Sequence, residues 1–237
     1  MAKVVSISGQ SPRPTLRLGR DATGRPVASR PKRSVRGGDG SGGHTGTVLD
    51  LMLPAVELAP LLVGALLTDG EVTVRLTEVE AYAGADDPAA HAWPGPRPHT
   101  QDLFADPGTL YCYRSHGIHI CGNITCGPTG SAILFRAGEV VAGAELVRER
   151  RGDIEAVQWA RGPGNLGKAM GWTLADSGRR FEGRLRLQQG AAVEVVSGPR
   201  VGVSVAWERR WRFWESGAAT VSAYRRSPRI QPGRHDW

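Results

Sequence analysis

The sequence has little of what secreted, disulfide-bonded or membrane-spanning proteins require. Its three cysteines, Cys112, Cys121 and Cys126, form an odd set within fifteen residues. That is a poor basis for a disulfide framework, so we expect reduced thiols. No run approaches the roughly 20 apolar residues of a membrane span, and residues 1–45 contain no apolar segment followed by a small-residue cleavage site. These absences predict a soluble intracellular protein that does not bind membranes.

Motifs for metals and nucleotides are also missing. The chain has no CxxC pair and no complete Walker phosphate loop. One cluster contains possible metal ligands: Cys112, His116, His119, Cys121 and Cys126. Its spacing differs from that of zinc fingers, and alternation along a strand would point its members to different faces. We therefore expect neither a metal nor a cofactor.

The formal net charge of +7 lies wholly in residues 1–45, where Asp21 and Asp39 face nine basic residues: Lys3, Arg13, Arg17, Arg20, Arg25, Arg30, Lys32, Arg33 and Arg36. This segment has too few large apolar residues to offset the entropy of ordering. We predict a disordered basic tail, which either contacts phosphates nonspecifically or only improves solubility. Residues 46–237 are formally neutral, so a nucleic-acid surface there requires an asymmetric arrangement of charges.

Apolar patterns predict two elements near a possible site. From Leu49 to Leu67 apolar residues recur at near-helical spacing, which predicts a helix on the core. From Val72 to Ala83 the residues alternate, which predicts a strand. Strict alternation would place one set on one face, Val72, Val74, Leu76, Glu78 and Glu80, and the other set on the opposite face, Thr73, Arg75, Thr77, Val79 and Ala81.

Three later stretches also predict local structure. Gly108–Ile124 is rich in β-forming residues and predicts two strands or a hairpin around Gly117. Val201–Ala206 has the composition of a short strand. The run Gly162–Lys168 predicts a Gly-rich turn before a helix, whose free N–H groups suit a phosphate, although an ordinary helix start explains the same pattern.

Glu80, Tyr82 and His91 place a carboxylate, an aromatic ring and an imidazole close together in the sequence. A carboxylate on an apolar strand can serve as a general base. The alternative is a structural ion pair between Glu80 and Arg75 or Arg136. From these residues alone, both interpretations stay open.

Several segments share their order and spacing with one known family: Thr77–Tyr82 (TEVEAY), Asp86–His91, Pro107–Tyr113 (PGTLYCY), Asn123–Ile124, Leu134–Ala137, Gly162–Leu166 and Arg200–Val203. From about Pro54 to Arg226 the chain resembles the alkyladenine (3-methyladenine) DNA glycosylase family of the type found in vertebrates. The resemblance implies an α+β fold. In this fold residues 46–237 form a single mixed domain with a curved antiparallel β-sheet and surrounding helices.

The resemblance also implies a monofunctional base-excision repair enzyme. Such an enzyme flips an alkylated or deaminated purine, of the 3-methyladenine, hypoxanthine or ethenoadenine type, out of double-stranded DNA and hydrolyses its N-glycosidic bond. We expect a monomer, located in the cytoplasm and nucleoid of a bacterium or the nucleus of a eukaryote. The alternative is a catalytically silent nucleic-acid-binding paralogue of the same fold. A zinc deaminase is disfavoured because the HxE and PCxxC motifs are absent.

By position, the resemblance assigns the reaction to three residues. Glu80 matches the general base, Arg136 matches the arginine that holds the attacking water with it, and Val201 matches the residue whose backbone carbonyl completes the water's contacts. The resemblance assigns the base-binding pocket to four more residues. Tyr82 would stack on one face of the flipped base and His91 and Tyr113 on the other, while Asn123 would reject the exocyclic amine of guanine.

The resemblance also assigns residues that contact the DNA outside the pocket. His116 stands where the family has the tyrosine that fills the gap left by the flipped nucleotide. Because imidazole covers less area than a phenol ring, we expect a less well stabilised flipped state. Lys168 and Arg200 are expected to contact the DNA backbone.

Overall fold

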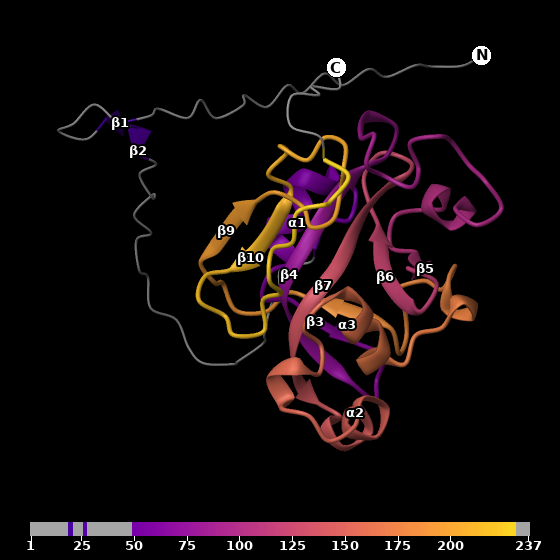
Figure 1. The fold of residues 1–237 in the computed structure, drawn as a ribbon, viewed down its shortest axis with the longest axis vertical. Helices are drawn as coiled ribbons and strands as arrows, with labels where there is room; N and C mark the ends of the chain where they lie inside the picture. Colours follow the sequence, from indigo (N-terminus) through magenta and orange to yellow (C-terminus); the bar gives the residue numbers. More distant parts are fainter. Residues whose placement is uncertain (1–18, 21–25, 28–48, 231–237) are drawn as a thin grey trace, which may run out of the picture. The chain divides into compact units, whose positions relative to one another are not determined.

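The computed structural model describes residues 49–230, together with residues 19–20 and 26–27 (Figure 1). The short strands β1 (Gly19–Arg20) and β2 (Pro26–Val27) pair with each other antiparallel. Both strands lie inside the segment 1–45, for which we predict disorder. The rest of that prediction, and the domain boundary after residue 45, fall outside the described residues.

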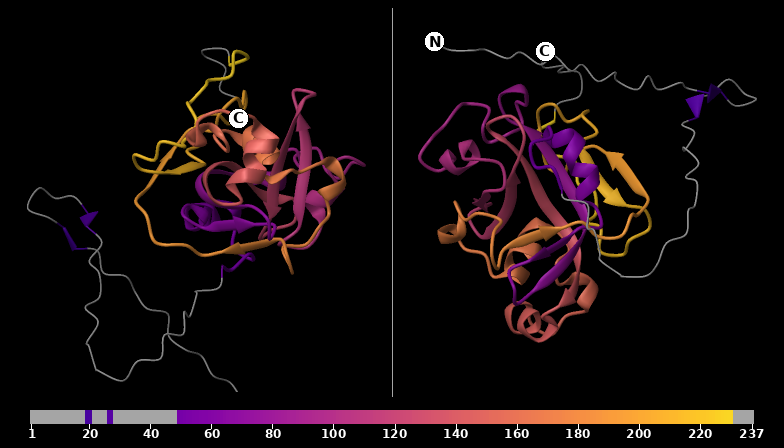
Figure 2. Two further views of the ribbon diagram at one scale, coloured as in Figure 1. Left: turned by 90° about the horizontal axis from the view of Figure 1, so that it is seen from below. Right: turned by 180° about the vertical axis from the view of Figure 1, so that it is seen from behind.

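An eight-stranded antiparallel sheet organises residues 49–230 (Figures 1 and 2). Its strands are β3 (Leu66–Thr68), β4 (Thr73–Ala83), β5 (Leu110–Ser115), β6 (His119–Thr125), β7 (Ser131–Ala142), β8 (Arg186–Gln188), β9 (Val195–Gly198) and β10 (Arg212–Glu215). Their order is β5-β6-β7-β4-β10-β9, and β3 pairs with both β4 and β8. Together with three α-helices, this sheet confirms the predicted α+β class.

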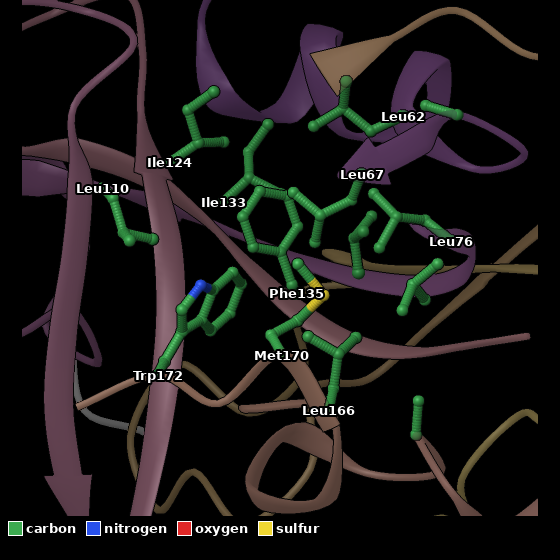
Figure 3. Packing of buried hydrophobic residues seen from close by; sticks show 14 of the residues in the cluster. Leu62, Leu67, Leu76, Leu110, Ile124, Ile133, Phe135, Leu166, Met170 and Trp172 are labelled. Carbon is green, nitrogen blue, oxygen red and sulfur yellow. The ribbon is translucent and has the colours of Figure 1, made fainter. Parts of the chain in front are cut away.

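The helices cover one face of the sheet. α1 (Ala55–Leu62) packs against β4, and α3 (Pro163–Met170) packs against β6 and β7. α2 (Ala144–Arg151) packs against α3. One apolar cluster fills the core between the helices and the sheet (Figure 3). It includes Leu62 of α1, Phe135 of β7 and Met170 of α3. Burial of this cluster is the main stabilising contribution to the domain.

Three local predictions are wrong, and backbone geometry explains two of them. The helix predicted over 49–67 ends at Leu62, because Gly64 adopts the left-handed φ of 89° and donates its N–H to the carbonyl of Leu76. The chain then continues as β3. The run 162–168 is not a turn before a helix, because Pro163 already begins α3. Residues 201–206 form bends rather than a strand.

The predicted alternation along β4 also fails, at a single point. The register with β7 shifts on both sides of Glu78. Val74 and Leu76 before the shift and Val79 and Ala81 after it all lie in the same core. An irregularity in the ladder changes which face the following side chains reach. Glu78 and Glu80 therefore lie on the face opposite Val74 and Leu76.

Two glycines let α3 lie close against the start of β6. A Cβ atom added to Gly167 would lie 2.0 Å from the carbonyl oxygen of Ile120, and one added to Gly164 would lie 2.8 Å from the Cβ of His119. Neither position has room for a side chain. α3 therefore packs directly against the β5–β6 hairpin, close to the exposed tip of the hairpin.

Candidate active site

Five residues lie directly opposite one another across five strands: Tyr111 of β5, Asn123 of β6, Leu134 of β7, Glu80 of β4 and Arg212 of β10. Residues paired in this way share one face of a sheet. The members of the adjacent row belong instead to the apolar core: Leu110, Ile124, Ile133 and Ala81. The face away from the helices is therefore the one that presents polar and aromatic side chains.

Two irregular segments cover this polar face. In residues 84–108, Ala92 and Leu103 form a small apolar cluster with Tyr111. The second consists of residues 199–211 and 216–222, on either side of β10: Val201 contacts Glu80, and the hydroxyl of Thr220 lies 2.8 Å from that of Thr77. The candidate residues of the middle strands are thus enclosed between two loops.

Glu80 is fully buried, and three donors hold its carboxylate. Oε1 accepts a 2.7 Å hydrogen bond from the Val201 N–H and lies 3.3 Å from Nη1 of Arg136. Oε2 accepts a 2.9 Å hydrogen bond from the Tyr82 hydroxyl. The structure therefore brings together Glu80, Arg136, Val201 and Tyr82. The observed contact of Val201 is made by its amide, whereas the sequence led us to expect a role for its carbonyl.

The second buried carboxylate, Glu78, forms the closer pair with Arg136. Nε of Arg136 and Nε of Arg212 each donate to Oε1 of Glu78 at 2.7 Å, and the Ser222 N–H donates to Oε2 at 2.7 Å. Burial by itself raises the pKa of Glu78, but Arg136 and Arg212 lower it overall. Glu78 is therefore ionised and neutralised by arginines. Arg75, the other partner we considered for Glu80, pairs with Glu139 and Glu215.

Tyr82 is backed by a buried arginine. Cζ of Arg200 lies 4.6 Å from the centre of the Tyr82 ring and 5.2 Å from that of Trp211. Its Nη1 and Nη2 donate to the carboxylate of Asp87 at 2.5 and 2.9 Å. The prediction that Arg200 contacts the DNA backbone is wrong, because its side chain is 0% exposed and already paired. One face of Tyr82 is occupied by Arg200, so a planar ligand would have to stack on the opposite face of this partly exposed residue.

The remaining pocket candidates lie on β5, β6 and the loop over them. The rings of His91 and Tyr113 meet edge to face at 4.6 Å, and Nδ1 of His91 lies 3.2 Å from the Tyr111 hydroxyl. Partial burial lowers the pKa of His91, and the charge of the nearby His99 lowers it further, so the imidazole is neutral at pH 7. Nδ2 of Asn123 donates to the carbonyl of Tyr111 at 3.1 Å, which fixes the orientation of this buried amide.

His116 lies at the exposed tip of the β5–β6 hairpin, which confirms the predicted hairpin around Gly117. His116 and Gly117 have φ angles of 50° and 74°, and the Ile118 N–H donates to the Ser115 carbonyl at 3.1 Å. Positive φ at both central residues is characteristic of a type I′ turn. Ile118, beside His116, is 75% exposed, the highest value among the large apolar side chains of the described residues. The sequence analysis did not single it out.

The described residues carry an uneven distribution of positive charge. Lys168 is exposed on α3. The segment 200–230 contains seven arginines and two glutamates. Four of its arginines are exposed, and we refer to them together as the C-terminal arginine surface: Arg210, Arg225, Arg226 and Arg229. The Gly202 N–H donates to the Arg225 carbonyl at 3.0 Å, so this segment runs beside the contact between Val201 and Glu80.

Metal ligands do not converge in the described part of the chain, where no group of three His, Cys, Asp or Glu side chains could hold an ion. The three cysteines are free and buried. Burial raises the pKa of Cys112 and of Cys126 to about 12, and that of Cys121 to about 11, so all three are protonated thiols at neutral pH. Among the described residues no helix is long and apolar enough to cross a bilayer.

A cavity of about 400 Å³ lies away from these residues, beside Arg75, Glu139 and Glu215. The charges that line it are already paired with one another, since Arg75 lies 3.1 Å from Glu139 and 2.7 Å from Glu215. None of the side chains around Glu80 lines it. We therefore place the candidate site at Glu80 rather than in this cavity.

Several residues that shape the site were not assigned a role from the sequence. Glu78, Asp87 and Arg212 have side chains that are almost fully buried, and each is paired with another charge. The alternation in the sequence already placed Glu78 on the same face as Glu80, two residues later, but gave it no role. Nothing local in the sequence indicates that Asp87 pairs with Arg200, 113 residues away.

Comparison with known proteins gives a consistent result. A family profile described as methylpurine-DNA glycosylase (MPG) matches residues 50–219. A protein of Rhodococcus jostii is 46% identical over 185 residues, covering 73% of this chain and 83% of its own length. A protein of Cutibacterium acnes is 44% identical over 190 residues, covering 75% of this chain and 100% of its own. The names of both describe them as 3-methyladenine DNA glycosylases.

Proposed function

This chain belongs to the methylpurine-DNA glycosylase family, and from that membership we propose that it excises alkylated or deaminated purines from double-stranded DNA by means of a water molecule activated by Glu80. The coarser function follows from the family and its relatives: the protein is a 3-methyladenine DNA glycosylase, a hydrolase of base excision repair. The observation that supports the mechanism is the buried Glu80 carboxylate, held by three donors on the polar face of the sheet.

In this mechanism the carboxylate acts on both reactants. As the bond between C1′ and the purine nitrogen breaks, the purine leaves with the bonding electrons and the sugar gains cationic character. Glu80 stabilises this charge and accepts a proton from the water, whose oxygen bonds to C1′. Arg136 and the Val201 amide keep the carboxylate in one orientation. A purine that alkylation has made cationic leaves as a neutral molecule, which makes it the better leaving group. A neutral lesion such as hypoxanthine leaves as an anion and takes up one proton from solvent, and Glu80 then releases its own proton to solvent.

The aromatic residues suit the recognition of such a base. The free face of Tyr82 would stack on one side of the purine, with His91 and Tyr113 on the other, and each stacked base contributes about 1–3 kcal/mol. Aromatic faces also attract a cationic purine. Because the pKa of His91 is lowered, a neutral imidazole would not repel that cation. The fixed Asn123 amide supports the proposed discrimination against guanine.

Contacts with the rest of the duplex would come from three places. His116 and Ile118, at the hairpin tip, would enter the gap left by the flipped nucleotide. Lys168, as the sequence led us to expect, would contact phosphates, and the C-terminal arginine surface would do so in place of Arg200. These exposed cations would give the formally neutral domain the asymmetric distribution of charge that binding to DNA requires. We propose that the protein acts as a monomer.

Two features support hydrolysis over the alternatives. Glu80 and Arg136 are both present and in contact, whereas a catalytically silent binding protein has no need of a buried carboxylate at the centre of its site. Lys168 is the only lysine after Lys32, and its exposed position on α3 does not suit a covalent nucleophile. We therefore propose a monofunctional enzyme that leaves the DNA strand intact.

The test is release of free base from a duplex containing hypoxanthine or 3-methyladenine, measured in single turnover without added metal. Glu80→Gln should lower the rate by at least a hundredfold, because general-base catalysis contributes about 10²–10⁴, and should leave lesion binding within threefold. Glu139→Gln, at an exposed carboxylate on β7, serves as the matched control and should retain the rate of the unmodified protein. Retention of base release by Glu80→Gln would refute the mechanism.

A further inference from the structure

The two oxygens of the Glu80 carboxylate are held differently. Oε1 faces both the Val201 amide and Arg136, whereas the Tyr82 hydroxyl is the donor found for Oε2 among the described residues. A carboxylate oxygen can accept two hydrogen bonds. Oε2 can therefore accept one further hydrogen bond, which the attacking water molecule would donate. The hydrogen bond from the Tyr82 hydroxyl fixes the direction of the remaining lone pair.

Tyr82 itself has little freedom to move. Its ring lies against Arg200, whose guanidinium also contacts the ring of Trp211 and pairs with the carboxylate of Asp87. Cζ of Arg209 lies 4.5 Å from the centre of the Trp211 ring, so a second arginine contacts the same ring. Arg200 is also covalently joined to Val201, the other residue that holds Glu80. Two consecutive residues, Arg200 and Val201, therefore hold the Tyr82 ring and the Glu80 carboxylate in place.

The hydroxyl remains a hydrogen-bond donor. Burial, and then the charge of Glu80, raises the pKa of Tyr82 well above its ordinary value. The phenol is therefore protonated across the physiological range, and its proton points to Oε2. This contact was not expected from the sequence, which assigns Tyr82 only the stacking of the base.

We infer that Tyr82 is a positioning residue for Glu80 as well as the platform for the flipped purine. This inference rests on the proposed function. A purine lying flat on the free face of Tyr82 leaves the ring in place and Oε2 aimed at the water.

The experiment compares Tyr82→Phe, which keeps the ring and removes the hydroxyl, with Tyr82→Leu, which removes both. Tyr82→Phe should bind a hypoxanthine duplex and flip the base within twofold of the unmodified protein, as reported by 2-aminopurine fluorescence. Its single-turnover rate should fall roughly tenfold, because the general base loses its alignment. Tyr82→Leu should lose both binding and rate. Tyr224→Phe, at an exposed tyrosine, should behave like the unmodified protein.

Two results would overturn the inference. A Tyr82→Phe rate within twofold of the unmodified protein would show that the hydroxyl does not position Glu80. A rate that falls only in proportion to lost flipping would show that the hydroxyl merely anchors the ring. Either result is distinct from failure of the proposed function, because Glu80→Gln would still be inactive. If Glu80→Gln remains active, the proposed function and this inference fail together.

Discussion

Arg136 donates from Nε to Glu78 at 2.7 Å, while its Nη1 lies 3.3 Å from Glu80. The shorter contact goes to the acid that Arg212 also neutralises. Two glutamates separated by one residue on the same strand therefore differ in role. Glu78 forms the structural ion pair, and Glu80 remains the carboxylate that is available for chemistry.

Replacing Glu78 should destabilise the fold. Glu78→Gln removes the acid that Arg136 and Arg212 share and leaves Glu80, beside Arg136, as the remaining buried carboxylate. This should reduce the free energy of unfolding by about 3 kcal/mol and Tm by roughly 10 °C at pH 7. Because the folded-state pKa of Glu78 is lowered, its stabilising contribution is present above pH about 4.5 and is lost as the pH falls through the lowered pKa. Thermal unfolding from pH 3 to pH 7 should therefore show a smaller acid-induced loss in Glu78→Gln. An equal loss in both proteins would contradict the assignment.

The hairpin tip should control how well the flipped state is held. His116→Ala should reduce the 2-aminopurine signal of a lesion duplex, and His116→Tyr should restore or increase it because the larger ring fills more of the gap. Ile118→Ala should reduce the signal further when combined with His116→Ala, since Ile118 supplies exposed apolar area beside it. Unchanged fluorescence in the double variant would exclude the tip as the wedge.

The C-terminal arginine surface should determine part of the salt dependence of DNA binding. A protein carrying Arg225→Ala, Arg226→Ala and Arg229→Ala should have a slope of log binding constant against log salt concentration that is smaller by roughly 2–3, since each phosphate contact contributes about 0.9. The paired change Arg184→Ala and Arg186→Ala, at exposed positions at and just before β8, should leave the slope unchanged. Equal slopes in all three proteins would disprove this use of the surface.

The packing of α3 should affect the hairpin. A methyl group at Gly167 would overlap the Ile120 carbonyl, so Gly167→Ala should lower the free energy of unfolding by at least about 2 kcal/mol and displace β6. Gly167 lies inside α3 without a positive φ, so the substitution adds no left-handed backbone strain. Lys168→Ala, at the exposed neighbouring position of the same helix, is the control and should change the free energy of unfolding by less than about 0.5 kcal/mol. If chemical denaturation gives the same small change for both variants, close packing is not the reason for Gly167.

Local sequence patterns predicted the parts of the fold that depend on local forces. The hairpin around Gly117, the strand that contains Glu80 and the apolar helix before it follow from short-range periodicity and turn chemistry. The patterns gave wrong predictions where one residue interrupts the regular spacing, at Gly64 and at the irregularity beside Glu78. Spacing alone cannot identify a residue that is not paired in the β-sheet, because the residues before it and after it still alternate.

The sequence by itself determined the family, the α+β class and the identity of Glu80, Tyr82, His91, Tyr113 and Asn123 as candidates, because these follow from residue type, order and spacing. The tertiary structure decided their roles relative to one another. It paired Glu78 with Arg136 and Arg212, buried Arg200 between Tyr82 and Trp211, and directed the Tyr82 hydroxyl to Glu80. The physical reason is that charges buried together must find partners, and those partners come from segments more than fifty residues apart in the chain.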